Sequence, residues 1–418
     1  MGLGACQPRR VKSPGGAGRG GLMLSLMGLA LWLWAVAAAG AGGAGLFWPE
    51  VGRRVLGHLQ GAEAAALRGA CSGAGTAAAP FRRSLQCRYG PAGRAPSPPL
   101  RPTELAELFL GAVILMPPRL AVGVALLVAH TVICVFCSWG MLGEWGPRQV
   151  APASGRYISF AILSLCGLRL SLERRGDRTE PAAVVVSNHC SYLDTFVLTY
   201  LYFPGFVAKA AVADVPLIGT IAKAMGSVFV ERTADTKRAA AAGQKHGQGS
   251  VLQDRIQELD ERMRADPSSS HKPLAVFAEG TTCNGEYVLP FKRGAFLAGV
   301  PVRPLAIIYK GGNLTAAWES VSASRHLLML LSGFSSYTVQ VIELPVIHPT
   351  EVEVADPALL AERTRQAIAE AGGFKFSTST LKEKREYEKV MKSEMRDIKQ
   401  RRRTGGAGRR EGKAAKDS

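Results

Sequence analysis

The chain is poor in aromatic residues and lacks the motifs of the common nucleic-acid-binding modules. Phe, Trp and Tyr make up only 7% of its 418 residues, and neither zinc-finger spacing nor an aromatic RNA-binding motif occurs. The chain nevertheless carries a formal net charge of +18 and a pI of about 9.8. Such a balance suits an anionic partner. Together these observations favour a phospholipid surface or a phosphorylated substrate over nucleic acid.

Three other signatures are absent. No Gly-x-Ser-x-Gly elbow occurs, so the sequence offers no serine nucleophile of that kind. No Asp-x-Asp-x-Asp-Gly loop occurs, so we expect no calcium control through EF-hands. The cysteines form no disulfide framework, which suits a reducing compartment. They stand at positions 6, 71, 87, 134, 137, 166, 190 and 283. We therefore expect neither a metal site nor a bound cofactor.

The N-terminal quarter changes composition twice. Residues 1–21 contain four Lys or Arg and no acid, and we interpret them as a basic disordered N-terminus. Residues 22–48 contain no charge and are long enough to span a bilayer. The alternative is a cleaved signal or transit segment, because residues 37–45 are all small. Residues 49–102 are rich in Gly, Ala, Pro and Arg and are typical of a linker.

A second hydrophobic region covers residues 103–147. Leu120–Gly143 contains no Lys, Arg, Asp or Glu and is long enough to span a membrane, whereas Leu108–Pro118 is not. The pair predicts either one transmembrane helix with an interfacial approach or a re-entrant hairpin bent at Pro117-Pro118. The basic N-terminus is expected to stay on the cytosolic side.

Short β-rich runs alternate with helical ones over residues 150–375. The expected strands are Ala183–Ser187, Phe206–Lys209, Ser227–Val230, Leu274–Phe277, Arg303–Tyr309 and Val339–Val346. The expected helices are Tyr192–Tyr202, Pro216–Met225, Val251–Arg264 and Pro357–Ala371. This alternation predicts an α/β domain with a mostly parallel sheet.

The last part of the chain, residues 376–418, is expected to be a basic tail. From Thr380 onward it carries 14 Lys or Arg against 7 Asp or Glu. Lys382–Gln400 can be helical. The tail is either a solvated extension or a segment attracted to anionic lipid.

His189 is the most informative single residue. It follows an apolar strand-like run, Ala182–Val186, and Asp194 comes five residues later. Five residues is the wrong step for one face of a helix. It fits a histidine on the turn after a strand with an aspartate in the first turn of the next helix. Asp194 would then hold one imidazole nitrogen, and the other would be free to take a proton from a hydroxyl.

Three further blocks follow in order. They are Gly226–Arg232, Phe277–Thr281 and Val300–Pro304. Together with Asn188-His189-x4-Asp194 they resemble the blocks of the glycerolipid (PlsC-type) acyltransferase family. The resemblance implies that His189 is the catalytic base and that Asp194 orients it. It also implies that Arg232 contacts a phosphate and that Glu279, Gly280 and Thr281 contact the substrate. The competing interpretations are a surface role for Arg232 and a simple turn at Glu279–Thr281.

The third block indicates which branch of the family the chain resembles. Thr282 stands where the lysophosphatidic acid branch usually has Arg, a residue that matches a doubly charged phosphomonoester. Glu279–Tyr287 and Pro290–Gly299 resemble lysophosphatidylethanolamine and lysophosphatidylcholine acyltransferases, closest to the plant type without EF-hands. Ala211 departs from the family, where an acid is common. The alternative is a lysophosphatidic acid or glycerol-3-phosphate acyltransferase.

The resemblance also implies partners and a location. We expect acyl-CoA as co-substrate, a lysophospholipid as acceptor, and contact with membrane lipids. Backbone N–H groups near the helix that follows His189 are expected to hold the thioester oxyanion. The endoplasmic reticulum membrane is expected, with the catalytic domain in the cytosol and the sequon at Asn313 unmodified; a plastid envelope is the alternative. A non-enzymatic, lipid-binding membrane scaffold is the remaining alternative.

Overall fold

The computed structural model describes residues 102–177, 179–230, 248–266, 272–311, 316–318, 323–334, 336–389, 393 and 396. All of them belong to one compact unit, Gly52–Ser418. Several predictions lie outside the described residues: those for residues 1–21, 22–48 and 49–101, for Arg232, for the sequon at Asn313 and for most of the tail beyond residue 389.

Seven strands form the main sheet, in the order β1-β8-β7-β2-β5-β3-β4. They are β1 (Leu168–Arg174), β2 (Val184–Ser187), β3 (Gly205–Lys209), β4 (Val228–Val230), β5 (Leu274–Phe277), β7 (Val302–Gly311) and β8 (Tyr337–Glu343). Only the β7–β8 pair is antiparallel within this sheet. The predicted α/β fold with a mostly parallel sheet is therefore confirmed. Two short strands, β6 (Tyr287–Val288) and β9 (Lys375–Phe376), pair separately.

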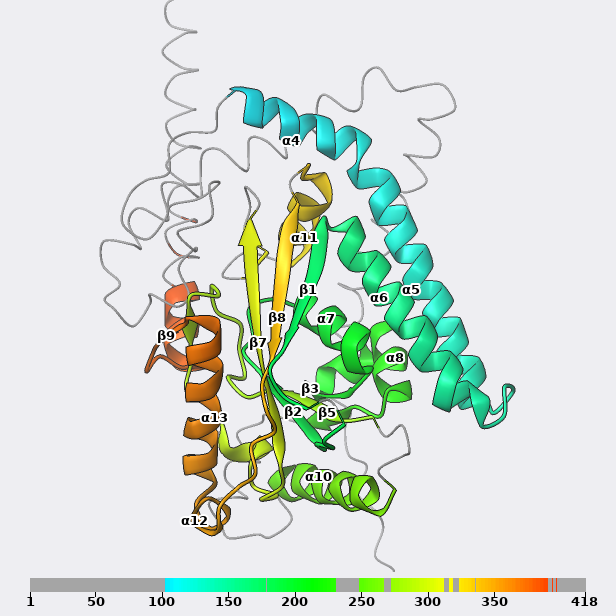
Figure 1. The fold of residues 1–418 in the computed structure, drawn as a ribbon. Coiled ribbons are helices and arrows are strands. Elements are labelled where there is room, and N and C mark those ends of the chain that lie inside the picture. The colour runs from blue at the N-terminus through cyan, green and yellow to red at the C-terminus, as the bar shows by residue number, and fades with distance from the viewer. Residues whose placement is uncertain are drawn as a thin grey trace, which may run out of the picture. The chain divides into compact units, whose positions relative to one another are not determined.

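Helices cover both faces of the sheet, as Figure 1 shows. One group is α10 (Gln248–Ala265), α12 (Glu351–Ala355) and α13 (Pro357–Gly372). The other is α5 (Met116–Ser138), α6 (Ala151–Leu165), α7 (Leu193–Tyr202) and α8 (Ile218–Ala224). Ile256 of α10 and Leu360 of α13 pack with strand residues such as Val184 and Leu274 in one buried cluster. Burial of this apolar surface is what holds the layers together.

Short helical segments complete the unit. They are α4 (Pro102–Ile114), α11 (Ala323–Ser332), the π-helical turn Gly146–Val150, and the 3-10 turns Ala210–Asp214 and Arg293–Ala295. Residues 381–389 are also helical.

The hydrophobic region before the domain forms α4 and α5, which are separated at Leu115. Pro117 and Pro118 lie in the first turn of α5, where proline costs no intrahelical hydrogen bond. Among the described residues, α5 is the one helix long and apolar enough to cross a membrane. Its 23 residues span about 34 Å. Arg119 at its start donates to the carbonyls of Leu331 and Gly333, which ties α5 to the domain.

Exposed large apolar side chains gather on α4, α5, the turn after α5, and α6. They are Leu110, Ile114, Val122, Val128, Val132, Phe136, Trp139, Met141, Leu142, Trp145, Tyr157 and Phe160. Figure 1 shows α4 and α5 in sequence, with α5 running beside α6. Exposed apolar side chains in such number on neighbouring elements are typical of surfaces that contact a membrane or another protein.

Candidate active site

His189 lies on the short connection between β2 and α7. Its Nδ1 is 2.9 Å from Oδ2 of Asp194, which occupies the first turn of α7, as the five-residue spacing predicts. The carboxylate accepts, so Nδ1 carries the proton and Nε2 presents its lone pair. The His189 side chain is 17% exposed and that of Asp194 is fully buried. Nε2 makes no hydrogen bond to any residue that the structure describes.

The Asp194 carboxylate is held by three further donors. Oδ2 also accepts the backbone N–H groups of Cys190 at 2.8 Å and Ser191 at 2.9 Å. Oδ1 accepts the hydroxyl of Tyr309 at 2.5 Å. Burial, reinforced by the charge of Asp194, raises the pKa of Tyr309 well above its usual value, so the hydroxyl stays a donor. Sequence reasoning missed Tyr309, which reaches the site from β7.

Several backbone N–H groups at the start of α7, where the oxyanion site is predicted, have partners within the protein. The N–H groups of Cys190 and Ser191 are bonded to Asp194, and that of Leu193 faces Oγ of Ser191 at 3.3 Å. The N–H of Asp194 bonds the carbonyl of Ser191. These donors hold the aspartate and close the turn, so they are not free to bind a thioester oxygen.

The backbone and ring of His189 are also fixed by neighbouring strands. Its N–H donates to Oε1 of Glu279 at 2.7 Å, and its carbonyl accepts from the N–H of Cys283 at 3.0 Å. Its ring stacks on Phe277 with centroids 3.9 Å apart. Asn188 exchanges two hydrogen bonds with the backbone of Ile307 on β7. These segments meet because β2 pairs in parallel with both β5 and β7. The C-terminal ends of the three strands therefore lie at the same edge of the sheet.

Glu279 is buried at 3% exposure. Its second oxygen, Oε2, accepts the N–H of Leu289 at 3.0 Å. Burial raises the pKa of Glu279 well above its usual value, although the two backbone N–H donors oppose this shift. Its visible role is to fix the backbone of His189, and the substrate contact remains a prediction.

Gly280 adopts φ of +70°, and a Cβ there would lie 2.1 Å from Nζ of Lys292. The positive φ favours glycine at this position, whereas the lysine contact is with the far end of a flexible side chain that can move aside. The lysine places a positive charge beside the Glu279–Thr281 turn. Substrate contacts for Gly280 and Thr281 remain predictions.

Comparison with known proteins identifies the family to which the chain belongs. The model of a family described as Acyltransferase matches residues 172–308. Arabidopsis thaliana has a protein named Lysophospholipid acyltransferase LPEAT1 that is 31% identical over 363 residues, which cover 75% of this chain and 87% of that protein. This chain belongs to the acyltransferase family. It is accordingly an enzyme, and the scaffold alternative is set aside.

Further relatives are similar over a shorter share of their own length. The Lysophosphatidylcholine acyltransferase of Drosophila melanogaster is 27% identical, over 71% of this chain and 54% of that protein. Lysophosphatidylcholine acyltransferase 1 of Homo sapiens is 27% identical, over 67% of this chain and 51% of that protein. The acyltransferase chain thus spans about half the length of these two proteins. A crystal structure of PlsC from Thermotoga maritima overlaps weakly, with a TM-score of 0.35 and 16% identity, covering 60% of this chain and 97% of that one.

The sheet explains why two of the acyltransferase blocks, those that contain His189 and Glu279, approach one another. β2, β5, β3 and β4 run in parallel, so the residues after each strand come out at the same edge. His189 follows β2 and Glu279 follows β5, the adjacent strand. Arg232 lies two residues beyond β4 and outside the described residues. Because β4 is three strands from β2, about 14 Å away, its phosphate contact remains a prediction.

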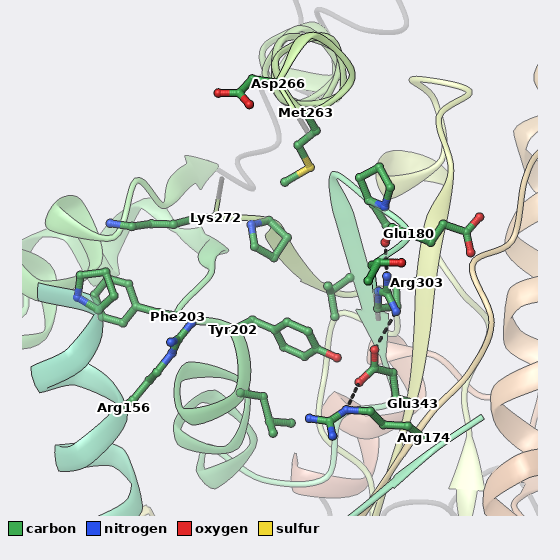
Figure 2. A pocket seen from close by; sticks show the side chains of 17 residues that line it. Arg156, Arg174, Glu180, Tyr202, Phe203, Met263, Asp266, Lys272, Arg303 and Glu343 are labelled. Carbon is green, nitrogen blue, oxygen red and sulfur yellow. Dashed lines mark hydrogen bonds and ion pairs between the residues drawn. The ribbon is translucent and has the colours of Figure 1, made fainter. Parts of the chain in front are cut away.

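The acyltransferase also has a cavity of about 250 Å³ at the opposite end of β2 and β7. Figure 2 shows its charged lining, in which Glu343 lies between Arg174 and Arg303. Glu343 Oε1 is 2.7 Å from Nη1 of Arg303, and Oε2 is 3.5 Å from Nε of Arg174. Arg303 also donates to the carbonyls of Asp177 and Glu180. The charges of the Arg303–Glu343 pair are satisfied internally, so we assign the chemistry to the His189 edge.

Proposed function

We propose that the enzyme transfers an acyl group from acyl-CoA to the free hydroxyl of a lysophospholipid, with His189 as general base. The observation that carries the proposal is the pairing of His189 Nδ1 with the buried carboxylate of Asp194, because it leaves Nε2 as a proton acceptor. Membership in the acyltransferase family supports the reaction class.

In this mechanism Nε2 takes the proton of the acceptor hydroxyl as its oxygen attacks the thioester carbonyl. The carbon–sulfur bond then breaks, and His189 returns the proton to the leaving thiolate, so that an ester and free CoA are formed. The transient imidazolium is stabilised by the carboxylate of Asp194, which four hydrogen-bond donors hold in place.

The acceptor we propose is lysophosphatidylethanolamine or lysophosphatidylcholine. The names of the similar proteins support this choice. Thr282 also supports it, because a headgroup with one phosphodiester charge needs an arginine at this position less than a phosphomonoester does. Lys384 lies beside Thr282, but its amine is bound to the protein.

We propose that α5 and the exposed apolar side chains of α4, α5 and α6 attach the enzyme to the endoplasmic reticulum membrane. A lysophospholipid lies in a membrane, so an attached enzyme meets its acceptor there. The catalytic domain would face the cytosol, where acyl-CoA is held and where the buried free cysteines would stay reduced.

The base assignment is tested by His189→Ala, measured in microsomes with labelled acyl-CoA. We expect the rate to fall roughly 10²–10⁴-fold because the hydroxyl loses its proton acceptor. His348→Ala is the matched control, since His348 is 64% exposed and pairs with Glu180 on the surface. Activity of His189→Ala within a few-fold of the parent would sink the assignment.

The acceptor is tested with a panel of lysophospholipids presented to the same microsomes. We expect lysophosphatidylethanolamine or lysophosphatidylcholine to give the highest kcat/KM. A clear preference for lysophosphatidic acid would favour the alternative acceptor and reject the argument from Thr282.

Sidedness is tested at the sequon Asn313-Leu314-Thr315. A cytosolic domain is never glycosylated, so glycosidase treatment should leave the mass unchanged. A glycosidase-sensitive mass that disappears in Asn313→Gln would place the domain in the lumen. Fusing residues 1–48 to a fluorescent protein distinguishes the endoplasmic reticulum from a plastid envelope.

A further inference from the structure

The segment from Ala278 to Leu289 controls the backbone of His189. It follows β5, and two of its residues bond the histidine directly. Glu279 accepts the N–H of His189, and the N–H of Cys283 donates to its carbonyl. The position of His189 therefore depends on whatever fixes this segment.

The residues that fix the segment Ala278–Leu289 come from the C-terminal part of the chain, beyond the residues that match the family model. β9 pairs in parallel with β6, so Lys375 and Phe376 lie beside Tyr287 and Val288. Arg365 of α13, which is buried, donates to the carbonyls of Val288 and Ser377 at 3.1 and 2.8 Å. Figure 1 shows β9 beside α13.

Lys384 adds a second contact at the other end of the segment. It belongs to the helical residues 381–389 and is only 6% exposed, although it lies in a region expected to be a basic tail. Its Nζ donates to both the carbonyl and the Oγ1 of Thr282, each at 2.8 Å. An ammonium is costly to bury, so its donors must be well placed, and two short bonds to one residue fix that residue's conformation.

The next residue after Thr282 is Cys283, whose N–H holds the carbonyl of His189. A short relay thus runs from Lys384 through Thr282 and Cys283 to the histidine. Catalytic groups must be held within a fraction of an ångström of their productive position, and a shift of about 1 Å can cost roughly a hundredfold in rate.

We propose that Lys384 is a positioning residue of the acyltransferase site, whose ammonium locks the Thr282–Cys283 turn and thereby the backbone of His189. It touches no reacting atom. The inference rests on the proposed role of His189 as the base.

The test compares three variants of the full-length enzyme in detergent. Lys384→Met keeps the length of the side chain and removes its donors, whereas Lys384→Arg keeps the charge and the donors. Lys382→Met is the matched control, because Lys382 lies on the same helical segment and is exposed. For each variant kcat, the KM of both substrates and the thermal midpoint are measured.

We expect Lys384→Met to lower kcat about ten- to a hundredfold with both KM values within about twofold. Lys384→Arg should recover most of the lost kcat, and Lys382→Met should match the parent. A folded Lys384→Met with parental kcat would overturn the proposal, and so would a variant whose loss lies in KM alone.

Two further variants keep the outcomes distinguishable. If Lys384→Met does not fold, Thr282→Val removes one acceptor of the ammonium and keeps the other; we expect kcat to fall about three- to tenfold, and a parental kcat would overturn the proposal. His189→Ala is assayed alongside. Activity of His189→Ala within a few-fold of the parent would reject the proposed base. A loss of about a hundredfold or more in His189→Ala, beside a parental Lys384→Met, would reject only the role of Lys384.

Discussion

At each end of β2 and β7 a buried carboxylate is bonded to a basic side chain, and the two pairs differ in how their remaining hydrogen-bonding groups are used. At one end Arg303 and Glu343 face each other at 2.7 Å, and the arginine also bonds two backbone carbonyls. At the other end Asp194 accepts four hydrogen bonds, but His189 uses only one of its ring nitrogens within the described part of the chain.

The difference separates structural from chemical use of buried charge. A buried ion pair is tolerated when its donors and acceptors are satisfied, and its main effect is on stability. Within the described part of the chain, Nε2 of His189 is the polar atom of this pair without a hydrogen bond, and the His189 side chain is 17% exposed. The Arg303–Glu343 end therefore stabilises the sheet, whereas the His189–Asp194 end leaves Nε2 able to accept a proton.

The largest effect should come from Asp194→Asn. The amide cannot accept from all of the donors that surround Asp194 and cannot stabilise an imidazolium, so the tautomer and orientation of His189 are lost. We expect kcat to fall roughly 10³–10⁴-fold. Labelled acyl transfer in detergent measures it. If folded Asp194→Asn loses less than about tenfold in kcat, the His189–Asp194 pair does not have the chemical role that distinguishes it from the Arg303–Glu343 pair.

Glu343→Ala is the mirror experiment at the other end. It leaves Arg303 buried at 5% exposure without its carboxylate partner. We expect the free energy of unfolding to fall by about 3–5 kcal/mol. Thermal denaturation in detergent measures this loss. The kcat of the protein that remains folded should stay within about twofold of the parent, and a selective loss of kcat would contradict a purely structural role.

Tyr309→Phe should have a smaller effect on the active pair. It removes the 2.5 Å hydrogen bond to Asp194 and keeps the ring. Hydrogen bonds to charged groups contribute about 1.5–3 kcal/mol, so we expect kcat to fall about ten- to a hundredfold. Tyr157→Phe is the control, because Tyr157 is 77% exposed. Equal kcat in both variants would show that Asp194 does not need its fourth donor.

The smallest effect concerns Glu279, a buried acid that accepts two backbone N–H groups, and it depends on pH. Burial raises its pKa above the ordinary value of 4.5 in the folded state. The folded protein then holds the proton more tightly than the unfolded chain does, so this contribution to stability is complete below pH 4.5 and is lost as pH rises through the folded pKa.

Glu279→Gln removes that titration. The thermal midpoint of the variant, relative to the parent, should therefore improve as pH rises from 4.5 to 8. A difference that stays constant over this range would show that the two N–H donors offset the burial of Glu279.

Local patterns made half of this site predictable. The step from His189 to Asp194 spans one turn, and the apolar runs of β2 and β5 mark the strands that bring His189 and Glu279 to one edge. The predicted strands and the helices α7, α8, α10 and α13 lie within a few residues of their expected bounds, whereas α6 is not predicted by the sequence pattern.

Contacts between residues far apart in the sequence could not be predicted from local patterns. Tyr309 is 115 residues from Asp194, and Lys384 is 102 residues from Thr282. No spacing rule links such pairs, because only the register of β7 and the course of the C-terminal segment bring them together. β1 was missed although Leu168, Leu170 and Leu172 alternate with polar residues, and β9 is too short to give a pattern.

The position of β1 at the end of the sheet has a consequence for how the protein is made. Leu168 pairs with Tyr337, so the first strand of the domain finds its only neighbour in the main sheet roughly 170 residues later. At a synthesis rate of about 5–20 residues per second, β1 waits on the order of ten seconds on the ribosome for β8 to emerge. During this interval its backbone donors and acceptors are an open edge, while α4, α5 and α6 are already outside the ribosome and able to reach lipid. Early capture of these helices by a membrane would hold the unfinished strand away from other nascent chains.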